Sequence, residues 1–251
     1  LTIKNYFFPE ISVILVVVLT TLVFTASNYR GQAEALKAIT VMNIVELVIL
    51  IGVGVLGIMQ VEPVNLEPFA PMGLGPLLPT MAFIYISYVG FDLITVAAEE
   101  IIEPAKNIPR AILITLGVGV GIYVLLLYVM MGVVNYTDLA QTSTPFIYVA
   151  DVLFGPWGRW AGVLATIMAS LSAFSVTLGA SSRVLFALGR DGYVPSVLAR
   201  LHPTHNTPHI ALFVCAGIVV LLGASGIVRL LASASSFGYL IAIGVVNYAV
   251  I

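Results

Sequence analysis

The segment between residues 85 and 100, YISYVGFDLITVAAEE, interrupts a long apolar stretch. A hydrophobic run that begins at Leu77 meets Gly90 and Asp92 where a simple membrane anchor would carry leucines, and it then resumes. Non-helical backbone at membrane depth leaves peptide groups without partners, so it is tolerated only where it lines a cavity or is buried in protein. The segment therefore indicates a spanning helix that is broken in the middle and faces a cavity.

The rest of the composition agrees with a membrane protein. Only 9% of the 251 residues are charged and 60% are hydrophobic, whereas a soluble domain carries about 25% charged residues. The chain is therefore expected to be an all-α, polytopic helix bundle. A net charge of −2 gives no reason to expect nucleic-acid binding. The single cysteine, Cys215, can form no internal disulfide.

A hydrocarbon core about 30 Å thick needs about 20 apolar residues for each helix. On this criterion the sequence predicts seven spans and no linker that would divide the chain into separate domains. The predicted spans are residues 9–26, 39–59, 77–102 (the broken one), 111–134, 160–182, 210–228 and 230–251.

Lysine and arginine are enriched in cytoplasmic loops, which allows the spans to be oriented. Alternating through seven spans puts seven of the ten basic residues on one side, which is then cytoplasmic, and the chain enters from outside. The chain starts at Leu1 without a signal peptide. We expect that N-terminal helices of the same protein precede it; an odd number, such as three, would restore a cytoplasmic N-terminus, and an even number would leave the N-terminus external. The seven residues are Arg30, Lys37, Lys106, Arg110, Arg183, Arg190 and Arg200.

The break offers backbone groups to a ligand. If the helix unwinds between Ser87 and Phe91, the carbonyls of Ile86, Ser87 and Val89 are free to hold an ammonium group. Asp92 then falls in the first turn of the second half-helix, where the helix dipole favours its charge. The alternative for Gly90 is a packing glycine in a continuous helix, since glycine is frequent in membrane helices.

Glu46 is the only ionisable residue between Lys37 and Glu62, and it lies about seven residues inside its predicted span, or roughly 10 Å at about 1.5 Å per residue. A hydrocarbon environment favours the protonated carboxyl, which makes reversible protonation feasible near neutral pH. The alternative is a permanently neutral carboxyl that is hydrogen-bonded to a serine or threonine of a neighbouring helix. Asp92 is the second candidate for ion coupling, because a carboxylate in a span often marks function.

Three other groups of polar residues have a functional and a structural interpretation. Asp92, Glu99 and Glu103 are spaced to share one helical face. They could form a proton path, or they could be interfacial carboxylates paired with Lys106, Arg110 or the arginines near the RDG segment. For Glu99, Glu100 and Glu103 we favour the second interpretation. The hydroxyls of Ser170, Ser172, Ser175, Thr177, Ser181 and Ser182 suit Na⁺, but more often serve helix packing. His202, His205 and His209 lie in a loop without a zinc-type partner set.

Two segments resemble a known family. ISYVGFDLITVAAEEIIEPAKNIPRAI is similar to the sixth helix and the following loop of the amino acid–polyamine–organocation superfamily, and is closest to its cationic-amino-acid-transporter-like branch. SRVLFALGRDGYVPSVLARLHPTHNTP is similar to the end of the eighth helix and the loop into the ninth. On this resemblance the chain covers the fourth to tenth helices. The glycine-broken first helix, which supplies half of the amino-acid site, is absent.

The resemblance implies a five-plus-five inverted-repeat transporter fold in one transmembrane domain, with residues 1–72 ending the first repeat and 73–251 in the second. It implies a substrate site at Ile86, Ser87, Tyr88, Val89, Gly90 and Phe91. The backbone of Ile86 and Val89 would accept the substrate ammonium. Relatives often place an aromatic gate where Ile86 stands, and here Tyr85 or Tyr88 would substitute. Some place a lysine where Glu46 aligns, so protonation, cation binding and no role all stay open for Glu46.

These inferences predict a secondary active transporter that carries amino acids across the plasma membrane by alternating access. Its partners are the amino acid and the lipid bilayer. No cofactor is expected, and H⁺ coupling is favoured over Na⁺. No nucleophile elbow, phosphate loop or HExxH motif is present, so nothing in the sequence indicates an enzyme. The alternative is a non-transporting receptor or assembly subunit of the same fold that senses an amino acid. Such a sensor usually adds a soluble signalling domain, and none is visible here.

Overall fold

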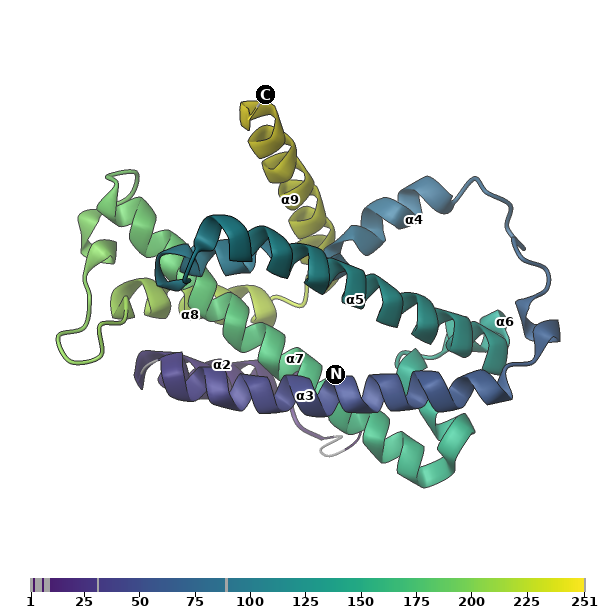
Figure 1. The fold of residues 1–251 in the computed structure, drawn as a ribbon. Helices are drawn as coiled ribbons and strands as arrows, with labels where there is room; N and C mark the ends of the chain where they lie inside the picture. The colour runs from purple at the N-terminus through teal and green to yellow at the C-terminus, as the bar shows by residue number, and fades with distance from the viewer. Residues whose placement is uncertain (1, 3–5, 7–9, 31, 89, 251) are drawn as a thin grey trace.

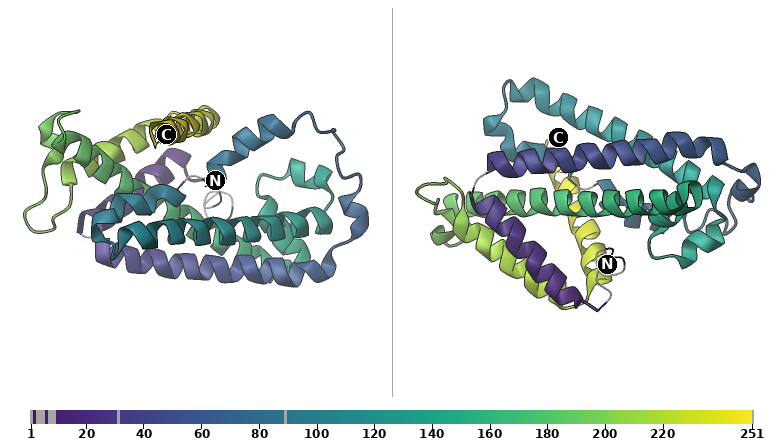
Figure 2. Two further views of the ribbon diagram at one scale, coloured as in Figure 1. Left: turned by 45° about the horizontal axis from the view of Figure 1, so that its top comes forward. Right: turned by 90° about the horizontal axis from the view of Figure 1, so that it is seen from below.

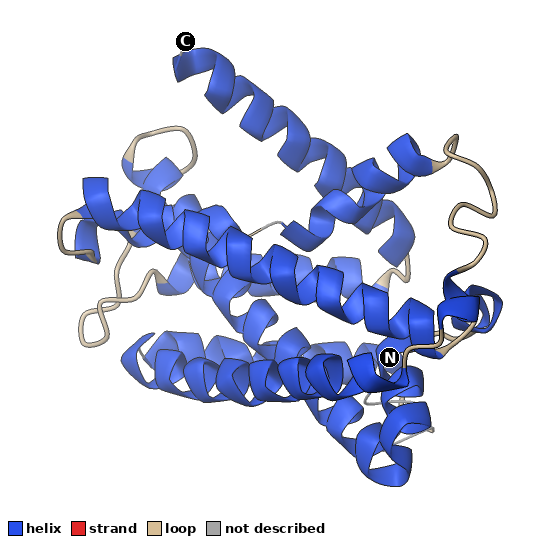
Figure 3. Ribbon diagram, turned by 45° about the vertical axis from the view of Figure 1, so that its right-hand side comes forward, coloured by secondary structure: helices blue, strands red, loops and turns tan. Residues whose placement is uncertain are grey.

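The computed structural model describes residues 2, 6, 10–30, 32–88 and 90–250, and every regular element in that part is a helix (Figures 1 and 3). Five of its helices are long and apolar enough to cross a membrane. A sixth, α8 (His209–Ala224), is apolar but shorter. The predicted all-α polytopic fold is therefore confirmed.

The first half of the chain contains two long helices followed by the broken span. A loop that contains two short 3₁₀ turns joins the second long helix to the broken span. The elements are α2 (Val13–Arg30), α3 (Gln32–Gly57), η1 (Ile58–Gln60), η2 (Pro63–Leu66), α4 (Leu77–Ile84), η3 (Tyr85–Tyr88) and η4 (Phe91–Glu100).

The second half contains three long helices and the shorter α8. Each of the seven predicted spans corresponds to a helix or, for the broken span, to the series α4, η3 and η4. The predicted start of the first span, Pro9, lies outside the described residues. The elements are α5 (Pro104–Val133), α6 (Tyr136–Gln141), α7 (Pro145–Arg190), η5 (Ser196–Ala199), α8 and α9 (Val228–Val250).

Helix α7 turns back on itself near its start. Gly155 has φ 61° and ψ −147°, which is far from helical geometry and favours glycine. The short arm before this turn packs on the long arm after it, because Gly158 and Gly162 leave room for the backbone at Ala150 and Ile147. The sequence predicted a span over residues 160–182 and missed the arm that folds onto it.

Two buried clusters hold the bundle together. In the first, α3, α5 and the short arm of α7 meet around Val53, Val129 and Val149. In the second, α7 and α8 meet at Leu178 and Leu212, and α2 packs against them. Figure 2 shows α2 and α8 lying side by side, with α7 passing next to them.

The loops predicted on one side of the membrane lie at one end of the bundle. The junction of α2 and α3, the start of α5 and the end of α7 all lie at the left of Figure 1. Arg190 ends α7, and Gly192 follows it with a left-handed φ of 83°, a common way to end a helix. The structure thus places the loops that were predicted to be cytoplasmic at one end of the bundle. The assignment of that end to the cytoplasm stays a prediction.

The outward faces of the helices are apolar. Val48, Leu113 and Leu221 on three different helices are 66%, 70% and 73% exposed. Helices α4 and α9 stand away from the main bundle (Figures 1 and 3). In water such surfaces would be costly, so they suit contact with lipid tails or with other membrane helices.

Candidate functional site

The broken span has the predicted interruption. Helix α4 ends at Ile84, the backbone tightens into η3, and Gly90 then takes φ 112° and ψ −10° before η4 begins. A positive φ of this size is costly for a residue with a Cβ and cheap for glycine. Gly90 is therefore the residue that permits the break, and the alternative of a packing glycine in a continuous helix is wrong.

Pockets that bind small molecules measure about 300–1,000 Å³, and the cavity beside the break measures about 540 Å³. Its lining comes from five elements that are far apart in the sequence: α3, the broken span, α5, α7 and α9. The polar side chains among its lining residues are Asn43, Glu46, Ser87, Tyr88, Thr115, Tyr123, Ser172, Thr177 and Tyr239.

The structure brings most of the predicted site residues to this cavity. Ser87, Tyr88, Gly90 and Phe91 line it. Val89 lies outside the described residues. For Ile86 and Asp92 the structure describes the backbone, in η3 and in the first turn of η4. Their predicted roles therefore stay predictions.

Glu46 lies on the middle turns of α3 and lines the same cavity as the break. Asn43, one turn earlier on the helix, lines it too. Among the described lining residues Glu46 carries the one carboxyl, and none carries a basic side chain. The arrangement therefore offers a cation or a proton a carboxylate that faces the break.

Two tyrosines that the sequence did not single out complete the lining. The phenol of Tyr123 on α5 donates a hydrogen bond to the carbonyl oxygen of Ser87 at 3.0 Å. Its ring packs edge-on against Tyr88, with ring centroids 5.6 Å apart. Tyr239 on α9 packs against Tyr85 with centroids 6.1 Å apart. Isolated tyrosines in otherwise uncharged spans were the available signal.

The sequence predicted that the Ser87 carbonyl is free to bind a ligand. In the structure this carbonyl is only partly available. A carbonyl oxygen has two lone pairs, and the Tyr123 phenol uses one of them. Of the two proposed substitutes for the aromatic gate, Tyr88 lines the cavity, whereas Tyr85 packs on Tyr239.

Of the three carboxylates expected to share a face, Asp92 and Glu99 lie in η4, which has 3₁₀ geometry with about 3.0 residues per turn. The structure describes only the backbone of these two residues, so the shared face stays a prediction. Glu103 follows the end of η4 and has a left-handed φ of 48°. Its carboxylate lies 3.4 Å from the Lys106 ammonium. The predicted pairing of Glu103 with Lys106 is confirmed, and its position at the membrane interface stays a prediction.

The hydroxyls of α7 mostly bond within the protein. Ser172 and Ser182 donate to carbonyls of their own helix, and Ser175 accepts the side-chain amide of Asn28 from α2. In the part of the chain that the structure describes, no cluster of three or more histidine, cysteine or acidic residues could hold a metal ion. These observations agree with a packing role.

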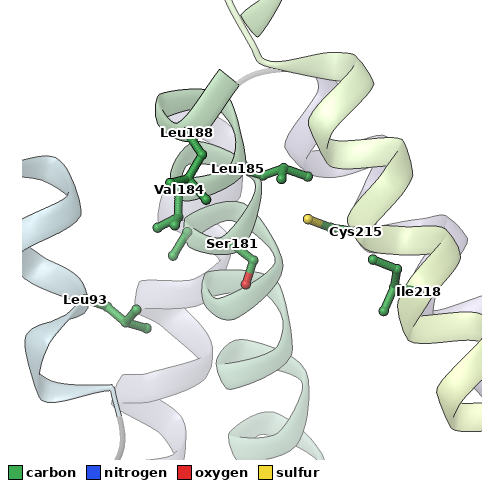
Figure 4. Close-up of a pocket in the computed structure, with 8 residues that line it drawn as sticks. Leu93, Ser181, Val184, Leu185, Leu188, Cys215 and Ile218 are labelled. Carbon is green, nitrogen blue, oxygen red and sulfur yellow. The ribbon is translucent and has the colours of Figure 1, made fainter. Parts of the chain in front are cut away.

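A second cavity, of about 360 Å³, lies between α7, α8 and η4 (Figure 4). Leu185, Leu188 and Ile218 give it a mainly aliphatic wall, interrupted by the Ser181 hydroxyl and the Cys215 thiol. It offers few groups to orient a zwitterion. The cavity beside the break is therefore the better candidate site for a polar ligand.

The fold and the cavity together define a class: a polytopic membrane protein whose broken helix faces a cavity between helices that is lined in part by polar side chains. The chain belongs to the amino acid permease family, whose model matches residues 2–251. The resemblance to the amino acid–polyamine–organocation superfamily is thereby confirmed. The family and the relatives are transporters, in agreement with the prediction that the chain is not an enzyme.

Three relatives show how the chain fits into the family. It is 31% identical to the branched-chain amino acid permease of Bacillus subtilis, over 89% of this chain and 48% of that protein. It is 30% identical to the methylthioribose transporter of Bacillus subtilis, over 92% of this chain and 50% of that protein. It is also 30% identical to the chloroplastic cationic amino acid transporter 9 of Arabidopsis thaliana, over 70% of this chain and 31% of that protein. The chain spans about half the length of the first two relatives.

Proposed function

We propose that the full-length protein carries amino acids across the plasma membrane by alternating access, with the substrate held at the break. The observation that supports this most strongly is that the break and Glu46 line one cavity. Broken helices of transporters place half-helix ends and unwound carbonyls where a substrate and its coupling ion bind.

The two ends of a zwitterion suit the two sides of the break. An ammonium group would bind to the backbone carbonyls of Ile86 and Val89, as the family resemblance implies. A carboxylate would lie near the start of η4, where backbone amides point out of the helix. Tyr88 and Phe91 would cover the substrate, and residues beyond this chain would complete the site.

Coupling to H⁺ through Glu46 is part of the same proposal, with Asp92 as the second candidate and Na⁺ as the less favoured ion. A lone carboxyl that faces a cavity in the membrane can take up and release a proton as the cavity opens to either side. In this proposal the chain forms one transmembrane domain. Residues 1–72 form the end of the first repeat, and residues 73–251 belong to the second repeat. No other cofactor is required.

Uptake of labelled amino acids into liposomes that contain the full-length protein tests the proposal. The names of the relatives select the panel: branched-chain and cationic amino acids, with methylthioribose beside them. Saturable uptake of an amino acid is expected. Saturable binding without flux would instead favour the amino-acid-sensing receptor, and neither binding nor flux for any of them would overturn both.

A further inference from the structure

We propose that Tyr123 is a positioning residue, whose phenol holds the broken span in its open backbone geometry beside Glu46. The part of this inference that concerns transport rests on the proposed function. The contact itself is a property of the fold, so it can be tested without any transported substrate.

The hydrogen bond from Tyr123 replaces one that the break removes. In a continuous α-helix the Ser87 carbonyl would accept the amide of Phe91, four residues later. Gly90 turns the backbone away from that path with its φ of 112°. The Tyr123 phenol, from the neighbouring α5, donates to this carbonyl at 3.0 Å. A backbone carbonyl at membrane depth needs a hydrogen-bond partner, so the phenol stabilises the broken form.

The tyrosine ring contributes a second contact to the same place. The rings of Tyr123 and Tyr88 are nearly perpendicular, at 84°, with centroids 5.6 Å apart. This edge-to-face arrangement is a favourable one for aromatic pairs. One side chain of α5 thus contacts two successive residues of η3, one through its hydroxyl and one through its ring.

Tyr123 also lies close to the candidate coupling residue. Tyr123 and Glu46 line the same cavity, on α5 and α3. The group that holds the break and the candidate coupling residue therefore face one space, which would link ion binding at Glu46 to the shape of the substrate site.

The test measures how readily the break is reached by a thiol reagent in the full-length protein. Cys215, which lies in the second cavity, is replaced by alanine, and Ser87→Cys provides a reporter whose backbone carbonyl is retained. Tyr123→Phe removes the hydroxyl and keeps the ring. The matched control is Tyr128→Phe on the same helix, because Tyr128 is 47% exposed and does not line the cavity.

We expect Tyr123→Phe to increase the labelling rate about three- to tenfold, the range for one hydrogen bond. Tyr128→Phe should leave the rate unchanged. We further expect Tyr123→Phe to raise KM for uptake by a similar factor while the maximal rate changes less. Equal labelling rates in the two variants would overturn the role of Tyr123.

A second pair of variants tests the same role if the Tyr123→Phe protein does not fold. Para-aminophenylalanine at position 123 keeps the ring and a donor and should label at the wild-type rate, whereas O-methyltyrosine lacks the donor and should label faster. The reverse order would contradict the proposal. If the wild type takes up no amino acid, the proposed function fails, and the labelling rates still decide whether Tyr123 holds the break.

Discussion

Asp151 and Arg159 face each other across the Gly155 turn of α7, with the guanidinium Nη2 2.6 Å from the carboxylate Oδ2. They lie on opposite arms of this turn, next to Gly158, where the two arms touch backbone to backbone. Their side chains are 25% and 51% exposed, and such pairs contribute about 0–1 kcal/mol. The close approach at Gly158 is therefore the stronger constraint on the turn.

The first prediction compares these two constraints. Gly158→Ala should destabilise the protein by about 3 kcal/mol or more, since the new Cβ would clash with the Ala150 carbonyl. Arg159→Ala should cost at most about 1 kcal/mol. Thermal unfolding of the purified full-length protein measures both.

The matched control for that comparison is Gly117→Ala on α5, where a Cβ would meet nothing within 4 Å. It should be neutral or stabilising by up to about 1 kcal/mol. A larger loss for Arg159→Ala than for Gly158→Ala would show that the ion pair, and not the backbone contact, fixes the turn.

The second prediction concerns the contact between α2 and α7. Asn28 is buried, and its side-chain amide donates to the Phe24 carbonyl at 2.9 Å and to Ser175 Oγ at 3.3 Å. A double-mutant cycle with Asn28→Ala and Ser175→Ala should give a coupling energy of about 0.6 kcal/mol, and at most about 1.7 kcal/mol. Strictly additive losses would mean that this hydrogen bond contributes nothing to stability.

The third prediction is a pH dependence of stability at the loop before α8. The pKa of His202 is lowered by its loss of solvent and by the neighbouring His205 and His209, whose rings lie 4.9 and 5.5 Å away. A lowered folded-state pKa means that the unfolded chain binds the proton more readily. The contribution of His202 to the stability of the folded protein is therefore fully present above about pH 6.5, which is the pKa of a histidine in the unfolded chain. This contribution is lost as the pH falls through the lower pKa of the folded state.

His202→Asn removes the titrating group and keeps an acceptor for the Thr204 hydroxyl, which lies 3.0 Å from His202 Nδ1. The decrease in Tm between about pH 7.5 and about pH 5.5 should be smaller in this variant than in the wild type. Equal decreases in the two proteins would show that His202 does not contribute to the pH dependence.

The fourth prediction tests ion coupling at Glu46. Glu46→Gln keeps the shape of the side chain but cannot release a proton, so an inward proton gradient should no longer accelerate uptake, while exchange without a gradient continues. Glu62→Gln, an exposed glutamate in the loop after α3, is the matched control and should keep the acceleration. If gradient-driven uptake is unchanged in Glu46→Gln, the proposed role of Glu46 is ruled out.

The apolar spans and the break could be predicted from the sequence because both depend on local properties. Hydrocarbon thickness sets the length of each span, and Gly90 next to Asp92 marks the break. The turn at Gly155 was missed although a Gly-Pro pair stands there. The arm before it is short, and its packing depends on Gly158 and Gly162, whose small size shows its effect only when the two arms meet.

The candidate site was predictable on the broken span and on α3, but not across the fold. Glu46 stands out because a carboxyl is rare inside a span, and Gly90 stands out because Asp92 follows it two residues later. Tyr123 and Tyr239 are ordinary residues for a membrane helix, and their value comes from neighbours distant in the sequence. The face that Asp92, Glu99 and Glu103 were expected to share assumes 3.6 residues per turn, whereas the segment from Phe91 to Glu100 is wound more tightly.

The tight winding of η4 also affects its reach. With a rise of about 2.0 Å per residue, its ten residues extend about 20 Å, whereas an α-helix of the same length would extend about 15 Å. Relaxation of η4 to α geometry would draw its two ends about 5 Å closer and rotate one against the other. The segment between Gly90 and the loop before α5 could thus change length along its own axis, without a hinge at either end.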